Sequence, residues 1–213
     1  MPSYTIPAQL AQPHSTELCI RRSRFLTQCA HTASPEEARA FIETIRCAHA
    51  DATHNCWAYA AGRPGDTARI GFSDDGEPHG TAGRPMLQVL LHSAVGEICM
   101  VVSRWFGGVK LGTGGLVRAY QDSVQKNLET LPLTTCIERD TLNVTLPYTF
   151  LTAVKRMLAA CDGILLTEKY QEEAQLTLAL PTEQTAQFLA TLANVSNGSA
   201  RIGHIPTTDA DLL

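Results

Sequence analysis

A glycine-rich segment between residues 101 and 120 carries the residue types that suit a ligand-binding site. It holds five glycines and three cationic side chains between a strand-like run and a helix-like run. Glycines let the backbone approach a ligand closely, and the first N–H groups of the following helix have no intrahelical partner. Such a helix end attracts anions, phosphate above all. The candidate ligand- or phosphate-binding residues are Arg84, Arg104, Gly107, Gly108, Lys110, Gly112, Gly114, Gly115 and Arg118.

The glycines also have a simpler explanation, because they would let the chain reverse tightly between a buried strand and its helix. The segment matches neither familiar phosphate motif. Lys110 is followed by Leu111 where a Walker loop needs serine or threonine, and the strand and acidic residue of a Rossmann motif are missing. Mononucleotide binding by either route is therefore not expected.

A second polar cluster spans residues 73–85 and contains Asp74, Asp75 and Glu77 in a run rich in glycine, threonine and proline. This composition is typical of an exposed loop. The three acids could hold a hard cation, but they lack the register of an EF-hand, and aspartate as a turn former explains the same residues. We expect this loop to lie close to residues 104–115, since both segments are polar and glycine-rich.

No metal site and no cofactor is expected. Cys47, His49, His54 and Cys56 offer four potential zinc ligands within ten residues. The first two would end a helix, while the other two alternate along a strand. A zinc site would require both elements to direct all four side chains to one point, and we do not expect this. The seven cysteines show no paired CxxC spacing and are typical of reduced, small apolar residues.

The elements that position these clusters form an α+β domain in residues 1–132. Ser34-Pro35-Glu36-Glu37 predicts a capping box and a helix start, and the helix near Gly114 or Gly115 has an apolar stripe through Leu116 and Tyr120. The patterns predict strands over 17–20, 24–32, 55–60, 68–73 and 97–105, a short helix over 84–93, and a sheet covered on one side.

The pattern restarts after Leu131-Pro132, so that residues 133–213 form a second domain. Apolar alternation around Val144, a helix from Leu151 to Cys161, strands over 164–170 and around Leu178, a helix from Thr182 and a strand from Ala200 to Ile205 follow in order. This βαββαβ order is the ferredoxin-like pattern.

Charge separates the two domains. Residues 1–132 carry 12 cationic and 12 acidic side chains, whereas residues 133–213 carry 5 and 9. Because nucleic-acid affinity comes mainly from cations that neutralise phosphates, any RNA contact should lie on the first domain, at Arg84, Arg104, Lys110 and Arg118. Trp105 and Phe106 could stack on bases, although core positions suit them better.

Composition is ordinary for a globular protein, with 44% hydrophobic and 18% charged residues among 213. No apolar run is long enough to span a bilayer, and the first residues do not resemble a signal peptide. We therefore expect a cytoplasmic protein, monomeric and without membrane contact.

The motifs together resemble those of bacterial members of the IMPACT family, over nearly the full length. The resemblance is carried by residues 23–25, 54–59, 72–78, 80–87, 104–112 and 118–120, which include the segments SRF, HNCWAY and RWFGGVKLG. It implies a first domain similar to the second domain of ribosomal protein five of the small subunit. It also implies a ferredoxin-like second domain similar to a C-terminal domain of elongation factor G.

The resemblance favours a non-enzymatic regulatory module linked to translation or stress response, because eukaryotic relatives bind a partner of a starvation-responsive kinase. Such a module would bind RNA, the ribosome or a translation-related protein through the first domain. The alternative is an enzyme that acts on a phosphorylated or nucleotide ligand at the glycine-rich turn, with Asp74, Asp75 and Glu77 holding a metal ion. A third hypothesis is a protein-interaction module that uses the second domain.

Overall fold

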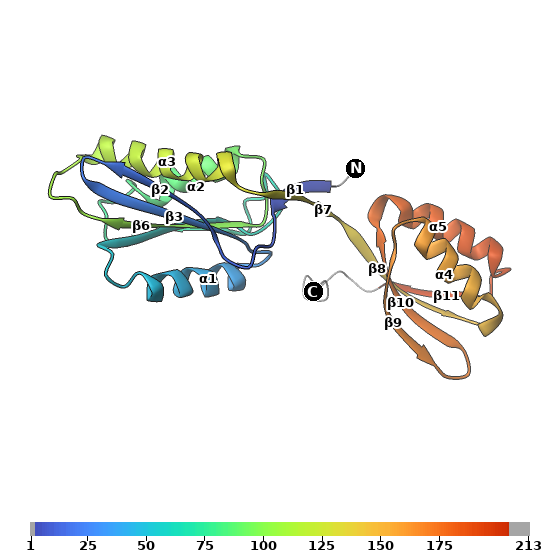
Figure 1. Ribbon diagram of the computed structural model, residues 1–213. Coiled ribbons are helices and arrows are strands. Elements are labelled where there is room, and N and C mark those ends of the chain that lie inside the picture. The colour runs from blue at the N-terminus through green and yellow to red at the C-terminus, as the bar shows by residue number, and fades with distance from the viewer. Residues whose placement is uncertain (1–2, 205–213) are drawn as a thin grey trace. The chain divides into compact units, whose positions relative to one another are not determined.

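Two compact units make up the computed structural model, which describes residues 3–204 (Figure 1). The first unit comprises residues 4–136, and the second comprises the residues from Ile137 onward together with Ser3. The end of the expected strand at Ile205 lies outside the described residues. The mixture of helices and strands and the division into two units confirm the α+β class and the two-domain arrangement.

None of the helices within residues 3–204 combines the length and apolar character that crossing a bilayer requires.

The first unit is built on a five-stranded antiparallel sheet in which β6 is central. Apolar residues dominate β6, and its side chains from Ile98 to Val102 are all buried, so this strand packs on both of its faces. In spatial order the strands are β2 (His14–Ile20), β3 (Ser23–His31), β6 (Ile98–Trp105), β4 (His54–Ala60) and β5 (Ile70–Ser73).

Helices cover both faces of this sheet. The helices α2 (Gly83–His92) and α3 (Thr113–Thr130) lie on one face, and α1 (Pro35–Ala48) lies on the other (Figure 1). Met100 packs beneath α2 and α3, whereas Val101, its neighbour in β6, packs beneath α1. The expectation of a sheet covered on one side is therefore wrong, because successive β6 side chains point to opposite faces and both sets are apolar.

Local signals place the helices as the sequence predicted. The Ser34 hydroxyl accepts a hydrogen bond from the Glu37 N–H, and the Glu37 carboxylate accepts one from the Ala33 N–H, which confirms the capping box. Leu116 and Tyr120 are buried along the inner stripe of α3, as predicted. The strands β1 (Ser3–Pro7) and β7 (Leu133–Ile137) form a separate two-stranded sheet that was not expected.

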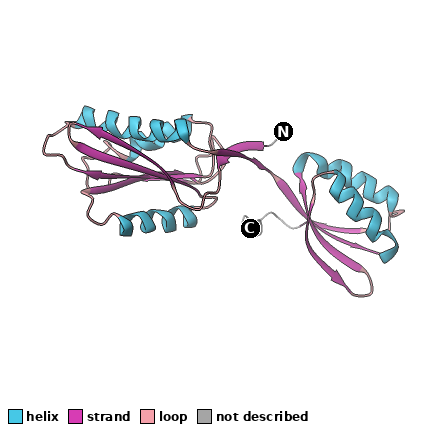
Figure 2. Ribbon diagram, in the orientation of Figure 1, coloured by secondary structure: helices cyan, strands magenta, loops and turns pink. Residues whose placement is uncertain are grey.

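The second unit has the ferredoxin-like βαββαβ order, with a short 3-10 helix, η1 (Tyr148–Phe150), before α4. Its antiparallel sheet has the order β11-β8-β10-β9, and both helices lie on one face of it (Figure 2). Leu142, Leu178 and Phe188 are central to the core between them. The elements are β8 (Arg139–Leu146), α4 (Leu151–Ala160), β9 (Ile164–Tyr170), β10 (Ala174–Pro181), α5 (Thr182–Val195) and β11 (Arg201–His204).

Candidate functional site

One end of the first unit's sheet brings together segments that are distant in the sequence. In the sheet register Arg24 of β3 lies opposite Trp105 of β6, and Arg104 lies opposite His54 of β4. The turn before β3, the loop before β4, and the segment after β6 therefore meet at this end. The loop over residues 74–82 joins them through contacts with β4 and β6.

A buried ion pair connects the two polar clusters. Arg104 Nη1 donates a hydrogen bond of 2.5 Å to Glu77 Oε1, and the two side chains are only 6% and 3% exposed. The Tyr120 hydroxyl donates a second hydrogen bond of 2.8 Å to the same oxygen. Arg104 and Glu77, one residue from each cluster, are therefore in direct contact.

The burial of Arg104 changes its expected role. Its charge is neutralised inside the protein by Glu77, and a second guanidinium nitrogen lies 3.5 Å from the buried Ser23 hydroxyl. Within the described residues its Nε has no hydrogen-bond partner. The sequence suggested that Arg104 would meet a phosphate on the surface, and this geometry gives that suggestion no support. The pair fixes the position of the loop that supplies Glu77, because removing either partner would leave the other charge buried and unpaired.

Asp74 caps helix α2 from outside the helix. Its Oδ1 accepts hydrogen bonds from the N–H groups of Ala82 and Gly83, at 3.0 and 2.9 Å, and its Oδ2 accepts one from Gly80 at 2.8 Å. Burial alone would raise the pKa of this carboxyl, but the three backbone donors and nearby His79 bring it below its ordinary value. Asp74 therefore occupies the anion position at this helix end.

Asp75 likewise serves the protein's own structure. Its Oδ2 accepts a 2.6 Å hydrogen bond from the Asn55 N–H, and its carbonyl oxygen lies 2.8 Å from His54 Nδ1. His54 Nε2 stands 3.9 Å from Glu77 Oε2. All three loop acids thus hold the loop against β4, β6 and α2.

Cys56 of β4 is buried at this end of the sheet. The Cys56 Sγ lies 2.9 Å from the Asp74 carbonyl oxygen, to which the thiol can donate, and 3.3 Å from the Tyr120 hydroxyl oxygen. Burial is the main reason why the pKa of both the Cys56 thiol and the Tyr120 hydroxyl is raised well above its ordinary value. A protonated thiol is a poor nucleophile and a poor metal ligand. Cys47, by contrast, is exposed on α1.

The glycine-rich segment passes directly against the β2–β3 hairpin. A Cβ atom on Gly107 would lie 2.0 Å from the carbonyl carbon of Arg22, so only glycine fits there. The Gly107 N–H donates to the Ser23 hydroxyl at 3.2 Å. The sequence suggested that Gly107 lets a ligand approach the backbone. In the structure the missing side chain instead leaves room for the backbone of the β2–β3 turn.

Helix α3 begins without a side-chain cap. Its N-cap is Gly112, which has a φ of 76° in the left-handed region, and no acidic residue lies in the first turn. Gly112 and Gly114 have open space where a side chain would be, and both are exposed. The helix end that the sequence predicted as an anion site is therefore accessible, in contrast to the one occupied by Asp74.

The exposed cations include two that sequence reasoning missed. Arg21 and Arg22 form the turn between β2 and β3, with φ values of 46° and 68°, and both are exposed. Two strand-like runs that flank this pair were the available signal for a tight turn there. Arg84, Lys110 and Arg118 are also exposed, and within residues 3–204 none of these five side chains has a hydrogen bond or ion pair.

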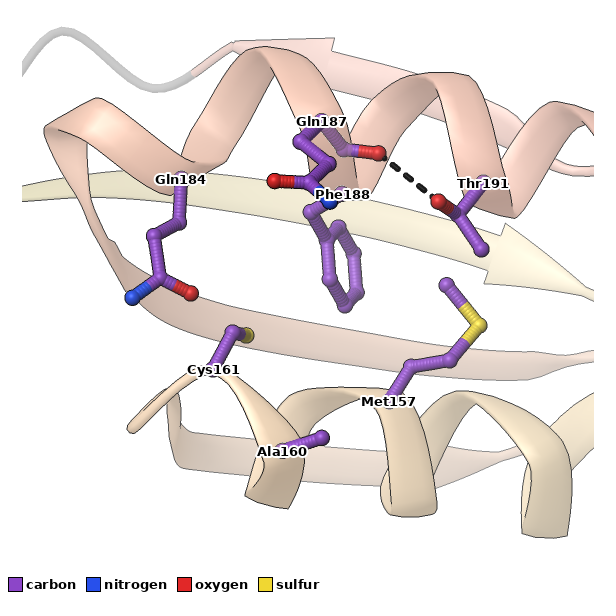
Figure 3. A pocket seen from close by; sticks show the side chains of 7 residues that line it. All are labelled: Met157, Ala160, Cys161, Gln184, Gln187, Phe188 and Thr191. Atoms are coloured by element: carbon purple, nitrogen blue, oxygen red, sulfur yellow. Dashed lines mark hydrogen bonds between the residues drawn. The ribbon is translucent and has the colours of Figure 1, made fainter.

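A separate pocket of about 210 Å³ lies in the second unit, between α4 and α5 (Figure 3). Met157 and Phe188 extend into it from the two helices, and the Thr191 hydroxyl bonds to the Gln187 carbonyl oxygen at its rim. None of the candidate residues predicted from the sequence lines this pocket.

Comparisons with known proteins agree with the two-unit division. Residues 21–128 match the family model described as Impact N-terminal domain, and residues 144–199 match a domain of unknown function, DUF1949. The chain is 44% identical to IMPACT family member YigZ of Escherichia coli K12, over 95% of this chain and 98% of that protein. It is 35% identical to IMPACT family member YvyE of Bacillus subtilis, over 87% and 85%.

A solved structure shows the same fold. The crystal structure of a hypothetical protein with 43% sequence identity superposes with a TM-score of 0.75 and covers 98% of this chain and 100% of its own.

Proposed function

This chain belongs to the IMPACT family, and from this premise and its geometry we propose that it is a non-enzymatic regulatory module linked to translation, which binds RNA through its first unit. The ribosome is included in this proposal, because its surface presents RNA phosphates. A translation-related protein as the partner is the outcome that the experiment below must separate from RNA.

The exposed cations at one end of the first unit carry this proposal. Arg22 lies against Gly107, and Lys110 follows three residues later in the same exposed segment. The uncapped start of α3 lies three residues beyond Lys110. Unpaired cations beside open backbone N–H groups are the arrangement that binds phosphates without reading sequence.

The loop acids strengthen the proposal because they are already engaged. Glu77 is paired with Arg104, and Asp74 and Asp75 accept hydrogen bonds from the backbone. A metal-dependent enzyme at the glycine-rich turn would need these carboxylates as ligands, and rearranging them would uncap α2 and break the buried ion pair. No observation specifically favours the enzyme alternative.

The test removes the cationic surface and measures RNA binding. In the variant Arg21→Ala/Arg22→Ala/Lys110→Ala, we expect weaker binding of a labelled ribosomal RNA fragment in an anisotropy titration. The slope of log affinity against log salt should decrease in magnitude by about 2, at about 0.7 for each lost phosphate contact. The control variant Arg39→Ala/Arg46→Ala/Lys169→Ala removes the same charge from exposed positions elsewhere.

The proposal predicts that only the first variant loses affinity and salt dependence. If both variants lose affinity equally, the interaction is diffuse attraction and not a site. If the parent chain fails to bind RNA at low salt but captures a translation-related protein, RNA is the wrong partner.

A further inference from the structure

We infer that Phe106 is a stacking platform for an unpaired base, so that the RNA bound at this end is single-stranded. This inference rests on the proposed RNA-binding function and names the class of RNA. It starts from an exposed aromatic ring, because 48% of Phe106 is accessible within a unit whose other central aromatic residues, Phe25 and Tyr120, are fully buried.

Phe106 differs from Trp105, its neighbour. The Trp105 indole Nε1 donates to Asp51 at 2.9 Å, and the Arg24 guanidinium lies 4.5 Å from the indole ring centroid. His49 packs edge-on against the same indole. Trp105 is thus engaged by three neighbours within the protein. The sequence favoured core positions for both aromatic residues, and for Phe106 this expectation is wrong, because the residue is 48% exposed.

The backbone on both sides of the Phe106 ring is held in place. The Phe106 N–H donates to the Thr53 hydroxyl at 3.1 Å, and the Gly107 N–H donates to Ser23. The Arg104 guanidinium lies 5.7 Å from the ring centroid. Since Arg104 is buried, it approaches the ring from the protein side and leaves the outer side to solvent. A ring presented by a fixed backbone loses little conformational freedom when a base stacks on it.

Cations that suit the phosphates beside such a base lie on the segments that adjoin Phe106. Gly107 follows Phe106 and lies against the Arg22 backbone, so the Arg21-Arg22 turn is close to the backbone that carries the ring. Lys110 lies four residues beyond Phe106. Aromatic rings interleaved with cations are typical of surfaces that bind single strands, because every base has a π-face and every nucleotide has a phosphate.

Base stacking separates single strands from duplexes. In a duplex the faces of the bases are covered by their neighbours, so its phosphates can reach Arg21 and Arg22 while its bases cannot reach Phe106. The cations alone would bind both forms. The exposed ring should therefore add affinity for the single strand only.

The experiment compares Phe106→Ala with Phe72→Ala in the full chain. Phe72 is the matched control because it is 44% exposed in the same unit but lies on the edge strand β5. The probes are a labelled 12-nucleotide RNA without self-complementarity and the same strand annealed to its complement. Inorganic polyphosphate serves as a chain of phosphates without bases.

We expect Phe106→Ala to weaken binding of the single strand by about 5- to 150-fold and to leave binding of duplex and polyphosphate unchanged. Phe72→Ala should change none of the three. Phe106→Trp should bind the single strand as tightly as the parent chain does, because a larger ring stacks at least as well. Fluorescence of Trp57 and Trp105, both in the first unit, reports whether Phe106→Ala keeps its fold.

Two results would overturn the inference while leaving the proposed function standing. In the first, Phe106→Ala binds the single strand as the parent does. In the second, it loses affinity equally for the single strand, duplex and polyphosphate. Failure of the parent chain to bind any RNA probe is a different result, since it refutes RNA binding itself.

Discussion

The replacement Arg104→Met should destabilise the first unit strongly, because it leaves the Glu77 carboxylate buried without its cation. Methionine keeps most of the length of the side chain, so the change removes charge and donors while leaving only a small void. Of the two donors to Glu77 Oε1, only the Tyr120 hydroxyl remains. Removing one partner of a buried pair costs about 3–5 kcal/mol, against a total of about 5–15 kcal/mol for a domain.

Urea unfolding followed by tryptophan fluorescence measures this cost for the first unit alone. The chain has two tryptophans, Trp57 and Trp105, and both lie in that unit. With a denaturant slope of about 2 kcal/mol per molar, the midpoint should fall by about 2 M. The second unit contributes no tryptophan signal, so its unfolding does not distort the measured curve.

The double variant Arg104→Met/Glu77→Gln separates buried charge from lost packing. Glutamine keeps an oxygen that can accept the Tyr120 hydrogen bond, and it carries no charge. We expect the double variant to be more stable than Arg104→Met alone. The reasoning is refuted if Arg104→Met costs less than about 1 kcal/mol, or if the second change destabilises the chain further. A loss of RNA affinity at unchanged stability would instead support the phosphate contact that the sequence suggested.

Other substitutions test the loop geometry and the capping of α2. Gly107→Ala should cost about 1–3 kcal/mol and weaken RNA binding, because its Cβ would lie 2.0 Å from the Arg22 carbonyl carbon. Gly114→Ala is the control for stability alone, since its Cβ meets no atom within 4 Å, and an equal loss of stability in the two variants would contradict the close approach. Asp74→Asn should cost about 1 kcal/mol at neutral pH by removing the charged cap of α2. The folded-state pKa of Asp74 is lowered, so its contribution is present above the ordinary value of 3.8 and lost as the pH falls further. A stability difference between parent and Asp74→Asn that does not shrink as the pH falls below 3.8 would contradict this assignment.

Local chemistry made most of the fold predictable from the sequence. The capping box at Ser34 depends on contacts within four residues, and the α3 stripe depends on helical periodicity. The alternation in the second unit led to the ferredoxin-like order for the same reason. The sheet of β1 and β7 was missed because each strand is five residues long and gains its partner from the other end of the unit.

The candidate site was only partly predictable because burial decides the role of each charge. Arg104 and Lys110 are both cations near the same glycines, yet one is buried with Glu77 and the other is exposed. That difference depends on where residues 74–82 fold back, which no local pattern reports. Arg21 and Arg22 carry no turn signature of glycine or asparagine, so their left-handed backbone came only with the structure.

The pairing of β3 with β6 has a consequence for when the cationic surface can exist during synthesis. The hydrogen bond from Gly107 to Ser23 spans 84 positions of the chain. A nascent chain that has left the ribosome only as far as the β2–β3 hairpin exposes Arg21 and Arg22. It still lacks residues 106–110, which complete the cationic surface. Contacts between such distant residues form late, because the chain entropy of closing the loop must be overcome first. Premature termination between β3 and β6 would therefore yield fragments that carry the two arginines but not Phe106 and Lys110 beside them.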